Sequence, residues 1–471
     1  MRIIAIVTAS LFFFINTLPI YSQTLENESI ENGGEYLIKR NDANNPCISS
    51  KEYEILDKQC AENRKLLGLD NIEKNISSVL LNWPLRAKSG FNDCSYYIIT
   101  AYVDQDFAAG AIKDYYCGNN TYDTHKGTDI ASWPFPFYKM DNSQVEVISA
   151  AAGTIINKSD GYFDRNCSSN SLTANFVVIQ HSDGSCALYW HLKSGSVTSK
   201  AIGQNVAVGE YLGVVGSSGS SSGPHLHFEI WAGGTSATYN DPFSGSCNSL
   251  NANSWWATQK PHSEPSVIKA SVHITDAVIP DCDTTETPNE STIYHIPFQG
   301  PGLPAGKAKF YIFIRDQVSG TTINLSILNP GVTTFDSWTY NCTHDYNGSY
   351  WTWTKALPTL PGRYTFQATY NGTTCSQSFD ILPTYEIMDN STIETYKVFP
   401  NPSNGVFTVE NKDNIKNKLT FEIYNVLGNS VFQSEILKNK SEQETNLQKG
   451  IYIYQIKEKK LIISSGKIII E

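Results

Sequence analysis

The sequence of 471 residues lacks three features, each of which would indicate a common class of protein. No pair among its ten cysteines has the CxxC spacing, which disfavours a zinc site built from thiolates and a thioredoxin-like redox centre. Lysine and arginine (35) are outnumbered by aspartate and glutamate (46), and the net charge is −11, so we expect no nucleic-acid partner. Beyond the N-terminus no apolar run is long enough to cross a bilayer, so the mature form should have no membrane span.

A long apolar stretch does occur at the N-terminus. Arg2 precedes "IIAIVTASLFFFINTLPI", and Ser22 is a small residue at a plausible cleavage point. Asn16 and Pro19 interrupt the apolar run, which argues against a membrane anchor. We therefore expect a signal peptide over residues 1–22 and a secreted or cell-surface protein that is exported through the periplasm.

The even number of cysteines fits an oxidising destination. Neighbours in the sequence could pair to form five local disulfides, although spacing alone does not determine connectivity. The predicted pairs are Cys47/Cys60, Cys94/Cys117, Cys167/Cys186, Cys247/Cys282 and Cys342/Cys375.

Hydrophobic patterning divides the rest of the chain into four parts and predicts a mostly β protein. Residues 23–82 are polar, with a helical pattern in "KEYEILDKQCAENRKLLGLDNIEKNI", and predict a leader or prosegment. Residues 83–260 hold short strands separated by Gly, Ser and Asn turns, which is typical of a mostly antiparallel β domain. Residues 261–387 predict an immunoglobulin-like β-sandwich. Residues 388–471 predict a small β module that contains no cysteine and no histidine.

The stretch "SSGPHLHFEIW" (residues 221–231) places two histidines in a predicted strand. Side chains two apart on a strand point to the same face, so the stretch has a core face and a chemical face. The core face carries Leu226, Phe228 and Ile230, and the chemical face carries His225, His227, Glu229 and Trp231. An HxH pair alone is a weak indication of a metal site. Glu229 either orients an imidazole or is a solvated carboxylate.

A second stretch, "THKGTDIASW", supplies His125 and Asp129 in a loop that runs into a predicted strand. A catalytic zinc ion is typically held by three protein groups and a water. His125, Asp129 and one histidine of the HxH pair meet that count, and the other histidine is then free to act on the water or the substrate. His191, in "LYWHLKSG", is either a surface residue at a strand end or a second base or oxyanion stabiliser.

These motifs, in this order, resemble the lysostaphin- and LytM-type zinc metallopeptidases, many of which are cell-wall endopeptidases. The likeness covers roughly residues 110–245. It rests on His125-x-x-x-Asp129, on Tyr189-x-His191-Leu192, and on Gly216-x-x-Gly219 leading to Gly223-Pro224-His225-Leu226-His227-Phe228-Glu229.

The resemblance implies a compact antiparallel β fold with an active-site groove and one zinc ion (Zn2+) per peptidase domain. It implies that His125, Asp129 and His227 hold the metal and that His225 and His191 are the catalytic pair. The HExxH motif of thermolysin-like enzymes is absent, so a histidine must replace its glutamate base.

The C-terminal residues resemble the sorting domain of the type IX secretion system of Bacteroidota. The likeness rests on the Phe399-Pro400-Asn401-Pro402 start, on "FEIYNVLGNSVF" and on "LQKGIYIYQIKEKKLIISSGKIII". It implies that the type IX machinery exports the chain across the outer membrane and that the domain is then removed. A plain β adhesion module is the alternative.

The two resemblances together imply a secreted zinc metalloendopeptidase. Its substrate would be a peptide in peptidoglycan cross-links or, as the alternative, an extracellular protein. A non-catalytic, metal-dependent wall-binding module is a further alternative; intact His191 and His225 argue against it, because binding alone would not require them. Trp255 and Trp256 either line a substrate groove or pack at the boundary with the next domain, and we favour packing.

Overall fold

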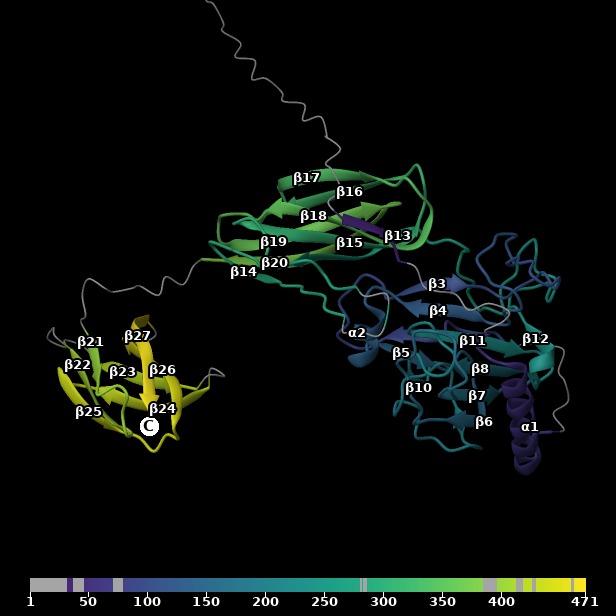
Figure 1. The fold of residues 1–471 in the computed structure, drawn as a ribbon, viewed down its shortest axis with the longest axis horizontal. Coiled ribbons are helices and arrows are strands. Elements are labelled where there is room, and N and C mark those ends of the chain that lie inside the picture. The colour runs from purple at the N-terminus through teal and green to yellow at the C-terminus, as the bar shows by residue number, and fades with distance from the viewer. Residues whose placement is uncertain are drawn as a thin grey trace, which may run out of the picture. The chain divides into compact units, whose positions relative to one another are not determined.

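The computed structural model describes residues 32–36, 46–70, 79–279, 282, 286–383, 396–411, 418–425, 429–458 and 461–471. The expected signal peptide, residues 1–22, lies outside them. The described residues are mostly in β-strands, as predicted, and the chain divides into two compact units, Met1–Thr384 and Tyr385–Glu471 (Figure 1). Within the described part of the chain, no helix has the length and apolar character needed to cross a membrane.

The first β domain is built around a large antiparallel sheet and a smaller one. The large sheet has the order β3-β4-β11-β8-β7-β6-β9, and β12 pairs with β11. Its strands are β3 (Tyr97–Ala101), β4 (Thr128–Ser132), β6 (Gly153–Ser159), β7 (Phe176–Gln180), β8 (Cys186–Trp190), β9 (Asn205–Val206), β11 (His225–Trp231) and β12 (Tyr239–Asn240). The smaller sheet, β10-β5-β2, contains β2 (Leu85–Ala87), β5 (Val145–Ile148) and β10 (Tyr211–Val214). Short helices α2 (Pro136–Asp141) and η1 (Ser236–Thr238) complete the domain.

Strand β11 lies inside the large sheet, between β4 and β8. Its alternate residues Leu226, Phe228 and Ile230 are fully buried in the core that both sheets share. The predicted alternation is therefore correct, and it leaves the histidines on the opposite face. Trp256 packs in this same core and Trp255 lies against it, so neither is confined to the boundary with the next domain.

Helix α1 (Ser50–Leu67) covers part of that opposite face, and its position confirms the predicted helix. Ser49 and Glu52 form a capping box at its start, and Gly68 ends it in the left-handed conformation. Leu56 and Cys60 are buried in a cluster with side chains from β6, β7, β8 and β11. The expected prosegment is thus packed against the first β domain.

The second β domain is a sandwich of two sheets, as predicted. One sheet has the order β1-β18-β15-β13 and the other β14-β20-β19-β16-β17. The strands are β1 (Asn32–Glu35), β13 (Ser266–His273), β14 (Ile293–His295), β15 (Lys307–Gln317), β16 (Thr322–Leu328), β17 (Thr334–Asn341), β18 (Tyr346–Ala356), β19 (Gly362–Tyr370) and β20 (Thr373–Leu382). A shared core of aromatic and aliphatic side chains joins the two sheets. Strand β1 comes from the N-terminal part of the chain and pairs with β18.

The two β domains pack against each other through their own apolar cluster. Trp133 is fully buried there, its ring stacks on Tyr36 and meets Phe313 edge-on, and its indole N–H donates to the Ile314 carbonyl at 3.2 Å. A disulfide between Cys94 and Cys375 also joins the domains. The first β domain and the sandwich therefore form one compact unit.

The predicted local disulfides are wrong. The bonds are Cys94–Cys375, Cys117–Cys247 and Cys167–Cys282, with sequence separations of 281, 130 and 115 residues. Cys47, Cys60, Cys186 and Cys342 are buried free thiols. Disulfides require Cα atoms about 4.4–6.8 Å apart, and the packing of distant strands and loops decides which cysteines meet that condition.

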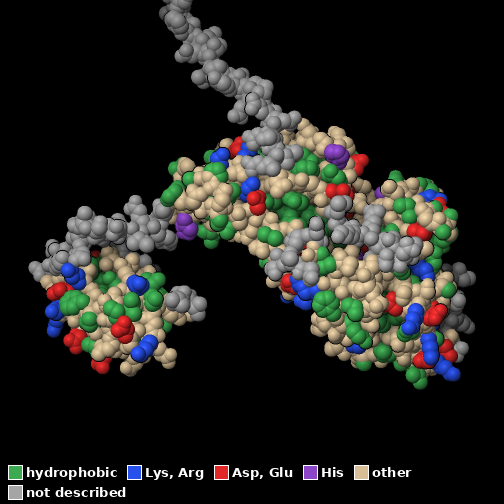
Figure 2. All heavy atoms as spheres, in the orientation of Figure 1, with side chains coloured by type: hydrophobic (Ala, Val, Ile, Leu, Met, Phe, Trp, Pro, Cys, Tyr) green, Lys and Arg blue, Asp and Glu red, His purple; other side chains and the backbone are tan. Residues whose placement is uncertain are grey.

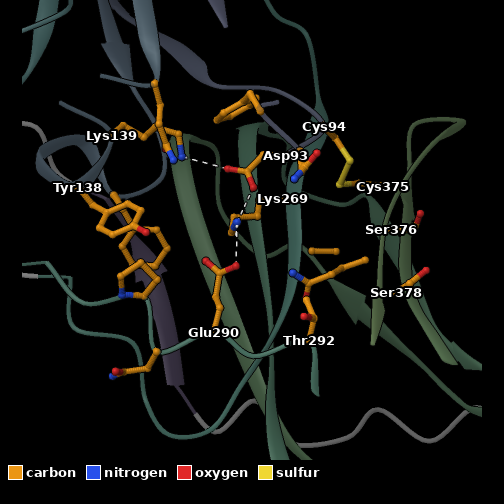
Figure 3. A pocket seen from close by; sticks show the side chains of 18 of the residues that line it. Asp93, Cys94, Tyr138, Lys139, Lys269, Glu290, Thr292, Cys375, Ser376 and Ser378 are labelled. Carbon is orange, nitrogen blue, oxygen red and sulfur yellow. Dashed lines mark hydrogen bonds and ion pairs between the residues drawn. A yellow bond between two sulfur atoms is a disulfide. The ribbon is translucent and has the colours of Figure 1, made fainter. Parts of the chain in front are cut away.

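A cavity of about 930 Å³ lies where the two β domains meet, beside the Cys94–Cys375 disulfide (Figure 3). Asp93 pairs with Lys139 at 3.1 Å and with Lys269, and Lys269 pairs with Glu290 at 3.1 Å. Arg363 also lines this cavity, and none of the predicted site residues does. The cavity is therefore separate from the candidate site.

The C-terminal unit contains two small sheets, β21-β22-β25 and β24-β23-β26-β27. The strands are β21 (Tyr396–Phe399), β22 (Val406–Asn411), β23 (Leu419–Tyr424), β24 (Ser430–Ile436), β25 (Lys440–Glu444), β26 (Gly450–Glu458) and β27 (Leu461–Ile470). Phe407, Phe421 and Ile456 are buried in its own core. On the face of the chain drawn in Figure 2, basic and acidic side chains are interspersed.

Candidate metal centre and catalytic site

Two adjacent strands and the loop before one of them bring the predicted metal ligands together. Asp129 on β4 and His227 on β11 are directly opposed in the antiparallel register, so their side chains share a face of the sheet. His227 Nδ1 lies 2.8 Å from Asp129 Oδ1, and His125 Nε2 lies 3.2 Å from the same oxygen and 3.1 Å from His227 Nδ1. His125 and Asp129, four residues apart, and His227, 98 residues after Asp129, present one atom each to a common point.

The hydrogen bonds of the two imidazoles leave these atoms available for a metal ion. His125 Nδ1 lies 2.7 Å from the Tyr102 carbonyl, which only accepts, so Nδ1 carries the hydrogen and Nε2 the lone pair. His227 Nε2 lies 2.8 Å from the Glu229 carboxylate, so in the neutral ring, the form that binds a metal, Nε2 donates and Nδ1 keeps the lone pair. Glu229 is fully buried, so the alternative of a solvated carboxylate is wrong.

The donor set fits a zinc ion. Two nitrogens and a carboxylate oxygen 2.8–3.2 Å apart either share protons in hydrogen bonds or bind a cation among them. Zinc binds nitrogen and carboxylate oxygen at about 2.0–2.2 Å in tetrahedral geometry, which sets neighbouring ligand atoms about 3.3–3.6 Å apart. The observed separations of 2.8–3.2 Å are shorter, so His125, Asp129 and His227 could hold zinc after moving apart by up to about 0.5 Å.

Two more histidines lie beside this cluster. The ring centroids of His191 and His225 are 4.5 Å apart, and His225 Nε2 lies 3.7 Å from Asp129 Oδ1. His225 Nδ1 lies 2.8 Å from the Gly223 carbonyl and His191 Nδ1 lies 2.6 Å from the Ser218 carbonyl. Nδ1 of each neutral ring therefore carries the hydrogen, and Nε2 can accept a proton. His191 Nε2 is buried and has no hydrogen-bond partner among the described residues.

Local backbone geometry sets the direction of both rings. His191 follows β8 with φ of 68°, a left-handed conformation that is uncommon for a residue other than glycine and that occurs at functional sites. Gly216 is bridged to His225, and a Cβ on Gly216 would lie 2.4 Å from the backbone nitrogen of Lys193. Only glycine permits this approach of the Gly216 loop to the segment after His191.

Burial changes the acid–base properties of these rings. It lowers the pKa of His191 well below its usual value, with His225 and His227 adding to the effect. Burial likewise lowers the pKa of His225, against the opposing effect of Asp129. Both rings are therefore neutral near pH 7, which leaves their Nε2 atoms as bases.

The structure brings all five predicted residues into one cluster and adds others that the sequence did not indicate. Cys47 Sγ lies 3.3 Å from His227 Nδ1, and one ligand atom from each of Cys47, His125 and His227 falls within a common 4.8 Å. The Tyr122 hydroxyl lies 3.4 Å from Cys47 Sγ and 3.3 Å from the Asp129 carboxylate. No motif identifies Cys47 or Tyr122, because each is placed only by the tertiary fold.

The site is covered in this structure. None of the predicted ligands and catalytic residues is more than 6% exposed: His125, Asp129, His191, His225 and His227. Residues 46–49, just before helix α1, contact the site: Cys47 Sγ lies 3.3 Å from His227 Nδ1, and the Ser220 hydroxyl donates to the Pro46 carbonyl at 3.0 Å. A substrate cannot reach these side chains while that segment stays in place.

Two parts of the chain match known families. Residues 123–239 match Peptidase family M23, and residues 397–471 match the secretion system C-terminal sorting domain. The first match contains the whole predicted ligand and catalytic set. Both resemblances drawn from the motifs are thereby confirmed.

Curated relatives and solved structures also match parts of the chain. The DD-carboxypeptidase/endopeptidase Mpg of Neisseria meningitidis serogroup B is 53% identical over 55 residues, 12% of each chain. The peptidoglycan DD-endopeptidase ShyC of Vibrio cholerae is 35% identical over 75 residues, 16% of each chain. This chain thus spans under a fifth of the length of these relatives. The catalytic domain of the antimicrobial peptidase lysostaphin from Staphylococcus simulans is 21% identical, with a TM-score of 0.20, over 30% of this chain and 85% of that one.

Proposed function

We propose, from the M23-family domain that encloses this site, that the chain is a secreted zinc metalloendopeptidase that hydrolyses peptide bonds in peptidoglycan cross-links. The observation that carries the proposal is the convergence of His125, Asp129 and His227 at 2.8–3.2 Å, beside the unpartnered Nε2 of His191. The names of the curated relatives, a DD-carboxypeptidase/endopeptidase and a peptidoglycan DD-endopeptidase, support the substrate class.

The metal would be held by His125 through Nε2, by Asp129 through its carboxylate and by His227 through Nδ1. When bound, zinc is a Lewis acid that lowers the pKa of a coordinated water and polarises a carbonyl group. Glu229 would keep His227 in the required tautomer by accepting from Nε2–H.

His225 and His191 would move the protons. In the neutral form each ring holds its Nδ1 hydrogen against a backbone carbonyl and offers Nε2 as the acceptor. His225, closer to Asp129, would accept the proton of the attacking water. His191 can donate to a developing oxyanion only after Nε2 has gained a proton, so its first role in this proposal is that of a second base.

The experiment uses purified chain loaded with one equivalent of zinc, before and after limited proteolysis, because residues 46–49 cover the site. Sacculi and a panel of extracellular proteins are incubated with each form, and new amino termini are identified by mass spectrometry. We expect cleavage within peptidoglycan peptides and none after exhaustive chelation. Cleavage that survives chelation would contradict a metallopeptidase, and cleavage of proteins alone would favour the alternative substrate.

Matched alanine variants test the division of roles. His225→Ala and His191→Ala should each reduce turnover by at least about 100-fold, the usual contribution of a general base, while zinc content stays at one per chain. Loss of zinc in His225→Ala would mean that the roles within the HxH pair are exchanged. If the wild type and both variants bind sacculi equally well and the wild type shows no turnover, the wall-binding module would be favoured.

We further propose that the type IX secretion machinery exports the chain by recognising residues 388–471. The match to the sorting domain supports this. Deletion of these residues should leave the chain in the periplasm, and normal secretion of the deleted chain would indicate a plain β adhesion module instead.

A further inference from the structure

We propose that Cys47 is a fourth ligand of the zinc ion and that residues 46–70 hold the peptidase in a latent form. The ligand assignment stands on geometry alone, whereas the latency rests on the proposed function. Cys47 Sγ lies 3.3 Å from His227 Nδ1, the nitrogen that faces the other two ligands. Among the described residues, one ligand atom from each of Cys47, His125 and His227 lies within 4.8 Å of the other two.

The spacing suits a zinc–sulfur bond. Zinc binds thiolate at about 2.3 Å and imidazole at about 2.0–2.1 Å, so a tetrahedral site separates sulfur from nitrogen by about 3.5 Å. Cys47 Sγ lies 3.3 Å from His227 Nδ1, near that value, and 3.9 Å from Nε2, so the sulfur or the ring must shift for both to bind one ion. Cys47 is a free thiol and is 4% exposed, so no disulfide removes it from this position. Binding would release its S–H proton to solvent and leave the thiolate on zinc.

Helix α1 fixes Cys47 in place from its C-terminal side. The capping box of Ser49 and Glu52 starts the helix two residues after Cys47. One helical turn later, the Tyr53 hydroxyl donates to the same Glu229 carboxylate that accepts from His227. The segment therefore contacts the metal-ligand network twice, once through sulfur and once through the carboxylate that orients a ligand.

The rest of the helix is docked on the first β domain by specific polar contacts. The Asp57 carboxylate accepts from the backbone N–H of Ser236 at 2.9 Å and from its hydroxyl at 2.6 Å. The Arg64 guanidinium donates to the Gly234 carbonyl at 2.5 Å. These contacts flank the buried Leu56 and Cys60, so the helix is held along its length. Helix α1 therefore forms a specific interface with the first β domain.

Occupation of the fourth position explains why this form would be latent. A catalytic zinc ion keeps one position for water or substrate, whereas four protein ligands are typical of a structural site. A thiolate from Cys47 would fill that position, in a site where His225 and His191 are buried as well. Activation then requires the departure of Cys47 and of residues 46–49 from the site.

X-ray absorption spectroscopy of the zinc-loaded full chain tests the ligand directly. We expect one sulfur at about 2.3 Å and three nitrogen or oxygen ligands at about 2.0–2.2 Å. Cys47→Ala should lose the sulfur, and the control Cys60→Ala, which removes a buried free thiol from the same segment, should keep it. A wild-type spectrum without sulfur would overturn the assignment even if the variant fails to fold, and so would a sulfur that persists in folded Cys47→Ala.

Hydrolysis tests the latency. If the covered state is strongly favoured, loss of the Cys47 ligand raises the fraction of molecules with an open site. Cys47→Ala should therefore turn over at least about tenfold faster than the wild type, whereas Cys342→Ala, which removes a buried free thiol from the core of the sandwich, should not. Equal rates for the wild type and a folded, sulfur-free Cys47→Ala would overturn latency. If neither form cleaves any substrate, even after limited proteolysis, the proposed peptidase function fails while a sulfur signal still supports Cys47 as a ligand.

Discussion

Gly127 lies in the predicted ligand motif, between His125 and Asp129, and packs against a ligand from the neighbouring strand. A Cβ at this position would lie 2.7 Å from His227 Cε1, 2.8 Å from His227 Nε2 and 2.9 Å from the Phe228 carbonyl oxygen. Carbon atoms in ordinary contact are about 3.5–4.0 Å apart. Phe228 is held in the ladder between β4 and β11, so the His227 ring must move by about 0.8 Å or more in Gly127→Ala.

That displacement acts on the hydrogen bond that orients the ligand. His227 Nε2 donates to Glu229 at 2.8 Å, and loss of such a partner typically weakens metal binding by about 10–100-fold. We therefore expect the zinc dissociation constant of Gly127→Ala to rise by about 10–100-fold, measured by competition with a chelator of known affinity.

The matched control is Gly223→Ala, because a Cβ on Gly223 would meet nothing within 4 Å although the residue lies close to His225. Circular dichroism establishes that both variants are folded. The displaced ring should weaken zinc binding by about tenfold or more. If folded Gly127→Ala binds zinc within about twofold of the wild-type affinity, the reasoning is refuted.

Three further predictions concern stability. Replacing Cys94 and Cys375 by alanine opens a loop of 281 residues and should lower the free energy of unfolding by up to about 5 kcal/mol; an unchanged denaturation midpoint would contradict this. Burial raises the pKa of Glu286 to about 7, so the folded state binds more protons than the unfolded state between pH 4.5 and about 7, and stability falls as pH rises through that range. Glu286→Gln should therefore stabilise the chain by about 3 kcal/mol at about pH 8 and far less at about pH 5. An equal effect at both pH values would show that the pKa of Glu286 is not raised in the folded state. Deleting residues 385–471 should leave the unfolding midpoint of the remaining unit unchanged, because the C-terminal residues form a separate compact unit with their own core, and a lowered midpoint would show that they stabilise it.

Much of the fold follows from local pattern. The two-residue alternation in β11 predicts which side chains enter the core, and the polar, periodic stretch before residue 70 predicts helix α1. The order of the three motifs was enough to predict His125, Asp129, His191, His225 and His227 as one site, and the structure brings them together. The strand and helix patterns depend on residues that are neighbours in the chain. The site could be predicted because few kinds of site combine these residue types in this order.

The sequence by itself was enough to predict the mostly β fold, helix α1 and the five residues of the candidate site, which the structure brings together. Only the tertiary structure decided the disulfide partners and the place of Cys47. Cys47 lies 180 residues before His227, and the absence of a CxxC spacing did not exclude it, because its partners are histidines from β11 and from the loop before β4. A contact across that separation depends on how helix α1 docks on the sheet, and docking depends on surfaces that exist only after the strands have paired.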